Sequence, residues 1–130
     1  MHGRLFTGLG EGAYYMSLEG YKKQFLMLLG FTPFPGTLNI SVDPSDVPLR
    51  KQLDVLPGLE VRGFKDGKRT YGPVKCFRAM VAGKYRSGAL VIERTHHGDS
   101  VLEVVSPVNL RKALGLAEGD RVSVAVLMEE

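Results

Sequence analysis

Residues 31–42, FTPFPGTLNISV, contain the change from helix to strand on which the fold prediction depends. The two prolines and the glycine of this stretch form a rigid turn through which no helix can continue. In the LNISV part, apolar and polar residues then alternate, which is typical of a strand with one buried face. The stretch therefore predicts a strand at residues 38–42 that begins directly after a rigid turn.

The residues before this turn predict a helix. Apolar side chains recur at helical spacing in residues 18–29, and Gly30 is a typical helix stop. We expect Ser17 to cap the N-terminus of this helix. Glu19 is expected in the first turn, where a carboxylate is favoured by the helix dipole. Ahead of the helix, residues 14–16, YYM, are expected to resume a strand.

Short strands separated by turn residues account for most of the remaining chain. The Asp-Gly pair within residues 65–68 is a strong hairpin signal. Short helices are expected at residues 46–54 and 108–114. We expect strands at residues 3–7, 59–64, 69 onward, 74–82, 89–94, 101–105 and 121–127. So many strands, with only two or three short helices, predict a mainly β fold in the form of a compact β-barrel.

Length and composition indicate one globular domain covering residues 1–130, with 44% hydrophobic and 24% charged residues. A single cysteine, Cys76, excludes an intrachain disulfide. The net charge of +3 suits an anionic ligand, but the basic residues are dispersed and indicate no nucleic-acid partner. Residues 1–6 lack the apolar core of a signal peptide, and no apolar run is long enough to span a membrane. We therefore expect a cytoplasmic protein without a membrane partner.

Three alternate glycines, Gly8, Gly10 and Gly12, form the first candidate site. Such a segment bends freely and can bring its backbone N–H groups against phosphate oxygens. It is no dinucleotide-binding fingerprint, because Tyr14 and Tyr15 open a helix poorly and no acidic residue lies about 20 positions further on. It is no P-loop either, because no Gly-Lys-Ser/Thr follows. A plain turn is the alternative interpretation.

Thr37 and Asn39 form the second candidate site. Residues two apart on an extended segment leave the same face, so this hydroxyl and this amide oxygen can reach one hard cation that keeps several waters. The alternative is two ordinary polar residues at the start of a strand.

Three further groups complete the candidates. Glu103 interrupts an apolar strand, so its carboxylate needs a partner or a ligand. Adjacent strand residues point to opposite faces, so His96 and His97 make a poor joint metal site. Residues 106–111, SPVNLR, enter a short helix whose first N–H groups, with Arg111 nearby, can hold an anion or read a base. Arg111 is alternatively an ordinary surface residue.

In their order and spacing, these segments resemble the archaeal CTP-dependent riboflavin kinases. The resemblance runs from residue 3 to residue 126, and its most specific part is PGTLN at residues 35–39. The GLGEG run at residues 8–12, ERT at 93–95, Glu103 and residues 107–111 are similar as well. The closing GDRV at residues 119–122 is similar but less specific.

The resemblance implies a six-stranded cradle-loop β-barrel. It implies a Mg²⁺-dependent transfer of the γ-phosphate of CTP to the 5′-hydroxyl of riboflavin, giving FMN and CDP. It also implies Mg²⁺ held by Thr37 and Asn39, and flavin contacts from Thr95 and Glu103. Glu103 is the one carboxylate that we nominate to orient or deprotonate the hydroxyl. The nucleotide-binding residues that it implies are Gly8, Leu9, Gly10, Glu11, Gly12, Ala13, Val108, Asn109, Leu110 and Arg111.

The chain departs from the family at Ala13, where a lysine is common. Lys22 and Lys23 are the neighbouring candidates to supply that charge. We expect a monomer with riboflavin and CTP as its small-molecule partners.

Two other functions remain open. One is a non-catalytic barrel that binds DNA, which the pI of about 9.1 and the GD-x-V ending would suit. The other is a flavin carrier that binds FMN without making it. No basic stripe with interleaved aromatic residues supports DNA binding, and that function would leave Thr37 and Asn39 without a purpose.

Overall fold

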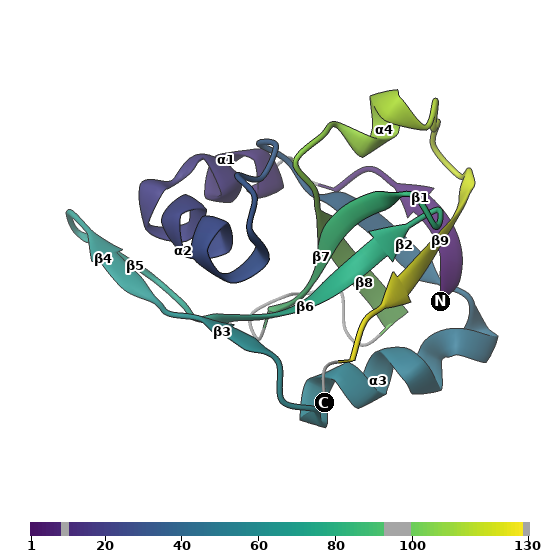
Figure 1. The fold of residues 1–130 in the computed structure, drawn as a ribbon, viewed down its shortest axis with the longest axis horizontal. Coiled ribbons are helices and arrows are strands. Elements are labelled where there is room, and N and C mark those ends of the chain that lie inside the picture. The colour runs from purple at the N-terminus through teal and green to yellow at the C-terminus, as the bar shows by residue number, and fades with distance from the viewer. Residues whose placement is uncertain (9–10, 93–99, 129–130) are drawn as a thin grey trace.

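The strand predicted at residues 38–42 is one of a series of short strands wrapped around a common core (Figure 1). The computed structural model describes residues 1–8, 11–92 and 100–128. The strands in these ranges are β1 (His2–Phe6), β2 (Leu38–Val42), β3 (Leu59–Val61), β4 (Phe64–Asp66), β5 (Arg69–Tyr71), β6 (Val74–Val81), β7 (Tyr85–Ile92), β8 (Val101–Val105) and β9 (Arg121–Val126). The helices are α1 (Glu11–Ser17), α2 (Glu19–Leu29), the 3-10 helix η1 (Pro44–Asp46), α3 (Val47–Val55) and α4 (Leu110–Ala113).

Among the described residues, six strands close an antiparallel barrel in the order β6–β7–β8–β2–β1–β9, and β9 pairs again with β6. Strand β3 extends the sheet at β6, with Leu59 opposite Cys76. Strands β4 and β5 form a separate two-stranded hairpin, in which Asp66 pairs with Arg69 around the turn. The mainly β, six-stranded barrel and the hairpin signal at residues 65–68 are therefore confirmed.

The described ranges contain four α-helices rather than the two or three expected. The additional helix is α1, which covers residues 14–16, so the strand predicted there is wrong. Met16 is buried, its neighbour Tyr15 is partly buried, and Tyr14 is exposed. Adjacent residues cannot share one face of a strand, but they can share one side of a helix. No helix in the described ranges is long and apolar enough to cross a membrane.

The predicted helix at residues 18–29 is confirmed as α2, with a different N-terminus. Its N-cap residue is Leu18, which makes no side-chain capping bond, and Glu19 lies in the first turn as expected. Ser17 instead closes α1, where its hydroxyl donates to the carbonyl of Tyr14. Gly30 ends the helix at a φ of 80°, a left-handed conformation that favours glycine.

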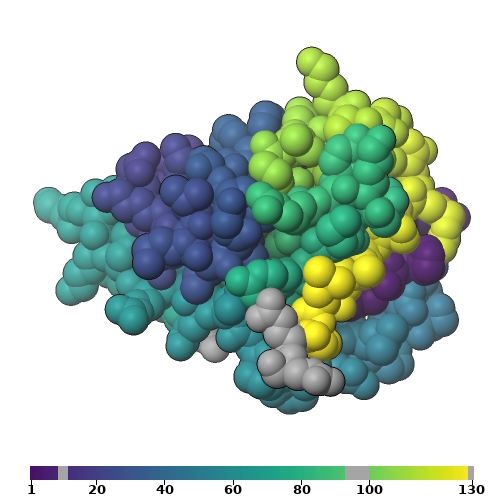
Figure 2. Space-filling model, in the orientation of Figure 1, coloured from purple at the N-terminus to yellow at the C-terminus, as the bar shows by residue number. Residues whose placement is uncertain are grey.

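Both faces of the strands β6, β7 and β8 are buried, and this creates two hydrophobic clusters. Leu38, Ile40, Leu102 and Val104 point into the barrel. Their strand neighbours point outward, and there Val105 packs against α2 in a second cluster. Helices α1 and α2 therefore form a layer on the outside of the barrel, and together with the β4–β5 hairpin they make a lobe at one side (Figure 2).

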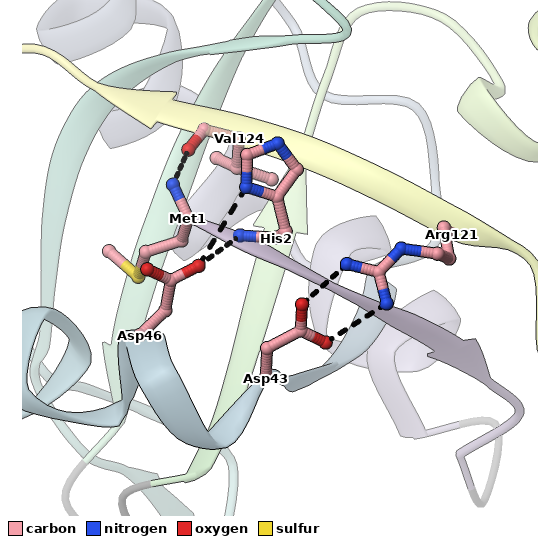
Figure 3. A network of polar contacts seen from close by, with 6 residues as sticks. All are labelled: Met1, His2, Asp43, Asp46, Arg121 and Val124. Carbon is pink, nitrogen blue, oxygen red and sulfur yellow. Dashed lines mark hydrogen bonds and ion pairs between the residues drawn. The ribbon is translucent and has the colours of Figure 1, made fainter.

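The first residues of the chain are held between β9 and the loop that follows β2 (Figure 3). The Met1 ammonium group donates to the carbonyl of Val124 at 2.7 Å, and the His2 backbone N–H donates to Asp46 Oδ2 at 2.7 Å. Arg121 donates through both terminal nitrogens to the Asp43 carboxylate, which holds the pKa of Asp43 below its usual range. The first two contacts hold the start of the chain to β9 and to η1, and the Arg121–Asp43 pair links β9 to the residue that follows β2.

Candidate active site

Asn39 and Glu103 lie side by side on the outer face of the barrel. Strands β2 and β8 pair with Asn39 directly opposite Glu103, and their apolar neighbours point into the barrel. Both polar side chains therefore leave the sheet on the side where α1 and α2 pack. Thr37, just before β2, donates through Oγ1 to Glu103 Oε1 at 3.5 Å. The structure thus brings together the three polar residues that the sequence singled out on these two strands.

Asn39 carries the clearest sign of an incomplete site. Its Oδ1 is buried, and it has no hydrogen-bond partner among the described residues. A buried acceptor without a partner loses its hydration and gains nothing in exchange, so such atoms are rare outside functional sites. Oδ1 is therefore available to a partner other than the described residues, such as a bound ligand.

Gly8 and Gly12, at the two ends of the glycine segment (residues 8–12), approach these residues closely. A Cβ on Gly8 would lie 2.4 Å from Asn39 Nδ2, and a Cβ on Gly12 would lie 2.3 Å from Thr37 Oγ1. Real Cβ atoms do not approach other atoms so closely, so both positions need glycine in this arrangement. Gly8 and Gly12 therefore bring the chain close to Asn39 and Thr37. Leu9 and Gly10 lie outside the described residues.

The end of the glycine segment begins α1 rather than a strand. Gly12 and Ala13 lie in its first turn, and Ala13 is exposed. The objection that two tyrosines open a helix poorly is therefore wrong for this chain. Lys22, one of the neighbouring lysines considered in place of a lysine at position 13, lies 3.5 Å from the Glu19 carboxylate.

Residues 108–111 lie at the start of α4, and each has a different environment. Val108 is exposed, and Asn109 caps α4 by accepting from the backbone N–H of Lys112. Leu110 is buried in the barrel core, so only its backbone is available to a ligand. Arg111 reaches Thr7, which directly precedes Gly8, at 3.5 Å from its hydroxyl.

Thr7 and Glu118 were not predicted from the sequence. The backbone N–H and the hydroxyl of Thr7 both donate to the carboxylate of Glu118, and these bonds hold the pKa of Glu118 below its ordinary value. The Arg111 guanidinium lowers this pKa further. This contact fixes the start of the glycine segment beside α4. No local pattern could have revealed it, because the two residues are 111 positions apart.

The oxygen donors present fit a hard cation such as Mg²⁺. Thr37 offers a hydroxyl and Asn39 an orphaned amide oxygen, with the Glu103 carboxylate next to both. Mg²⁺ prefers oxygen ligands, keeps several waters and commonly takes its remaining ligands from phosphates. In the part of the chain that the structure describes, no cluster of three His, Cys, Asp or Glu side chains offers another metal site. Thr95, His96 and His97 lie outside the described residues.

These features define a class of domain: a small antiparallel barrel with an oxygen-lined site on its outer wall, which Gly8 and Gly12 approach closely. Residues 5–126 match the family model described as "CTP-dep_RFKase: Domain of unknown function DUF120", and the chain belongs to this family. The resemblance to the archaeal CTP-dependent riboflavin kinases is thereby confirmed.

Curated relatives in several archaea carry the name "Riboflavin kinase". The relative from Pyrobaculum arsenaticum is 60% identical over 127 residues, which cover 97% of this chain and 60% of that protein. The relative from Methanoregula boonei is 48% identical over 124 residues, covering 95% of this chain and 55% of that protein. The relative from Archaeoglobus fulgidus is 48% identical over 127 residues, covering 97% and 54%. The chain therefore spans between 54% and 60% of the length of these relatives.

Proposed function

We propose that this domain is a riboflavin kinase that transfers the γ-phosphate of CTP to the 5′-hydroxyl of riboflavin, giving FMN and CDP, with Mg²⁺ as cofactor. The names of the relatives support riboflavin as the acceptor, and the description of the family model supports CTP as the donor. The observation that carries the proposal is the orphaned Asn39 Oδ1 beside Thr37 and Glu103, directly under Gly8 and Gly12.

Thr37 Oγ1 and Asn39 Oδ1 would hold Mg²⁺, and the chemistry supplied there is neutralisation of the charge on the nucleotide phosphates. The backbone of residues 8–13 would contact the same phosphates, because glycine lets N–H groups approach them closely. Arg111, held beside Thr7, adds a positive charge at the start of this segment, and residues 108–110 would contact the cytidine.

In the transfer itself, the riboflavin 5′-oxygen forms a bond to the γ-phosphorus while the bond from that phosphorus to the β–γ bridging oxygen breaks. CDP leaves with the electron pair of that bond. Glu103 would accept a hydrogen bond from the attacking hydroxyl and take its proton as the new bond forms. Phosphoryl transfer asks the protein mainly for positioning and charge neutralisation, so this role needs proximity more than a strong base. Thr95 would complete the flavin contacts.

The test compares Thr37→Ala with Thr37→Ser by measuring FMN formation over a range of Mg²⁺ concentrations. Loss of the hydroxyl in the alanine variant should lower kcat/KM by roughly 10²–10³-fold, as loss of a single charge-stabilising group in an active site does. Serine retains the oxygen and should restore most of the activity. Ser41→Ala, an exposed change on the strand that follows Thr37, serves as the control. Near-normal turnover of Thr37→Ala would refute the metal assignment.

A further inference from the structure

A cluster of tyrosines with one arginine joins α1 to the β4–β5 hairpin. The hydroxyls of Tyr14 and Tyr71 are hydrogen-bonded at 2.5 Å, and Arg69 Nη1 donates to Tyr14 at 3.3 Å. The guanidinium of Arg69 also lies over both rings, 5.5 Å from the centroid of Tyr14 and 5.4 Å from that of Tyr71. The Tyr15 ring meets Tyr71 edge-on at 6.1 Å. We call Tyr14, Arg69 and Tyr71 the tyrosine–arginine latch.

The β4–β5 hairpin depends on α1 and α2 for its position. It projects away from the barrel (Figure 1), and its strands pair only with each other in the described ranges. A two-stranded hairpin of this size is not stable alone in water. Phe64 anchors its first strand by packing edge-on against Tyr21 of α2 at 4.7 Å. A Cβ on Gly20 would lie 2.6 Å from the Phe64 ring, so the hairpin and α2 are in close contact.

Helix α1 likewise depends on its neighbours, because a helix of seven residues does not persist by itself. One end of α1 lies at the candidate site, where Gly12 packs on Thr37. Tyr14, two residues further on, carries the hydroxyl that the hairpin holds. Whatever fixes Tyr14 therefore also fixes Gly12, and with it the side of the glycine segment that faces Thr37.

The latch is held by hydrogen bonds with a defined geometry, and hydrophobic packing alone does not explain why these three residues meet. Tyr14 is 43% exposed and Arg69 is exposed, so neither contributes much to the hydrophobic core. Phenylalanine at positions 14 and 71 would supply the same ring contacts. The two hydroxyls add a defined distance between helix and hairpin, and Arg69 adds a donor that binds the Tyr14 hydroxyl while packing on both rings.

We propose that Tyr14, Arg69 and Tyr71 are positioning residues, which hold α1 so that the glycine segment is set against Thr37 and Asn39 and thereby determine the affinity for the nucleotide. This proposal rests on the proposed function, because the nucleotide is the ligand that the glycine segment would bind there. The latch joins the middle of α1 to the hairpin, two residues along the chain from Gly12. Its loss should weaken nucleotide binding and leave the barrel intact.

The experiment uses Tyr14→Phe, Tyr71→Phe and their double variant, with Tyr85→Phe as a matched control. Tyr85 is intermediate in burial between the exposed Tyr14 and the buried Tyr71, and it too has a cation over its ring, Lys84 at 5.4 Å. It begins β7, away from the lobe. The first measurement is amide hydrogen exchange of residues 11–17 in the ligand-free protein. The second is the KM for CTP and for riboflavin, and the third is the melting temperature.

We expect the latch variants to raise the exchange rate of residues 11–17 by about tenfold, because local opening becomes easier. The KM for CTP should rise about five- to tenfold, as the fraction of molecules with a correctly placed segment falls. The KM for riboflavin and the melting temperature should change little. The double variant should resemble Tyr14→Phe, because that change already removes both the bond between the two hydroxyls and the bond donated by Arg69, whereas Tyr71→Phe removes only the first. The control should alter none of these quantities.

Unchanged exchange in residues 11–17 would overturn the proposal, because the latch would then not hold α1. Raised exchange with an unchanged KM for CTP would overturn its role in nucleotide binding. A lower melting temperature with equal losses for both substrates would assign the cluster to stability alone. If the wild-type protein makes no FMN with any donor, the proposed function fails, and calorimetric titration with Mg·CTP replaces the KM. Weaker Mg·CTP binding in the latch variants would then still support the positioning role, and equal or absent binding in all proteins would refute it.

Discussion

Replacing Asn39 by leucine should separate stability from activity in this domain. Leucine branches at the same atom as asparagine, so it fills the same space on the outer face of β2 without polar atoms. The substitution removes the buried Oδ1 that has no hydrogen-bond partner among the described residues. It also removes one of the two oxygens that we assign to the metal.

The size of the stability effect follows from the burial of Asn39 Oδ1 without a hydrogen-bond partner among the described residues. Leaving a buried acceptor unpaired costs about 1–3 kcal/mol, and asparagine is also disfavoured in strands. Part of this gain is offset because the second methyl group must fit where Nδ2 now meets the backbone of Gly8. We expect the free energy of unfolding to rise by about 1–2 kcal/mol, which corresponds to roughly 4–7 °C in melting temperature for a domain of this size.

The assay combines urea unfolding without ligands with FMN formation under saturating substrates. Activity should fall by roughly 10²–10³-fold as the protein becomes more stable. Ser41→Ala on the same strand should change neither quantity by more than about 0.5 kcal/mol or twofold. A second variant, Asn39→Asp, keeps an oxygen but places a carboxylate opposite Glu103. It should therefore be destabilised without ligands and should regain stability when Mg²⁺ is added.

Two results would refute this reasoning. If Asn39→Leu lowers the free energy of unfolding by more than about 1 kcal/mol, the oxygen is satisfied in solution and marks no ligand site. If the variant is more stable but still fully active, the oxygen is orphaned and has no part in the reaction.

Three further predictions concern other residues. Gly12→Ala should leave the helix content intact, since alanine is favoured over glycine in helices by about 1 kcal/mol. The new Cβ would displace Thr37 and should therefore lower FMN formation at least about tenfold. Full activity would contradict the approach of 2.3 Å between that Cβ and Thr37 Oγ1. Cys76 is fully buried and burial raises its pKa to about 11, so about one thiol in a thousand is ionised at pH 8; rapid alkylation of the native protein by iodoacetamide would disprove this environment. The bonds from Thr7 lower the pKa of Glu118 below 4.5, so the stabilisation from this carboxylate is present above pH 4.5 and is lost as the pH falls through the lowered pKa. Between pH 6 and pH 3, Thr7→Val should therefore lose less free energy of unfolding than the wild-type protein, as measured by urea unfolding. An equal loss in both proteins would argue against the contact.

The strands could be predicted from the sequence because alternation and turn residues are local signals. Strand β8 matches its predicted bounds, and β2 follows its rigid turn as expected. Strand β7 begins at Tyr85, earlier than predicted, because Arg86, Ser87 and Gly88 carry no apolar alternation that would indicate a strand, although Ser87 is buried. The order of strands in the barrel could not be predicted, since pairings such as β1 with β9 join the two ends of the chain.

The strand predicted at residues 14–16 is wrong for a related reason, because contacts with distant parts of the chain decide the structure there. Tyr15 and Met16 are adjacent, and the sequence alone does not say that both have a surface to pack against. The structure provides it through Tyr71 of the hairpin and the outer face of the barrel. Tertiary packing therefore decides for a helix where local propensity favoured a strand.

In the candidate site, the functional residues could be identified from the sequence, but the residues that they contact could not. A hydroxyl, an amide and a carboxylate in apolar surroundings drew attention to Thr37, Asn39 and Glu103, and the structure places them together. Their assembly depends on the pairing of β2 with β8, which no spacing reveals. Glu118 escaped notice for the same reason, because its partner Thr7 is near the opposite end of the chain.

The most direct test of the central claim is one incubation of the purified protein with riboflavin and Mg²⁺, separately with CTP, ATP, GTP and UTP. FMN is resolved by chromatography, and a sample with excess chelator serves as the metal-free control. The account predicts FMN with CTP well above the other donors and none in the chelated sample. No FMN with any donor, from protein shown to be folded, would contradict the assignment and leave a barrel that binds its ligand without phosphorylating it.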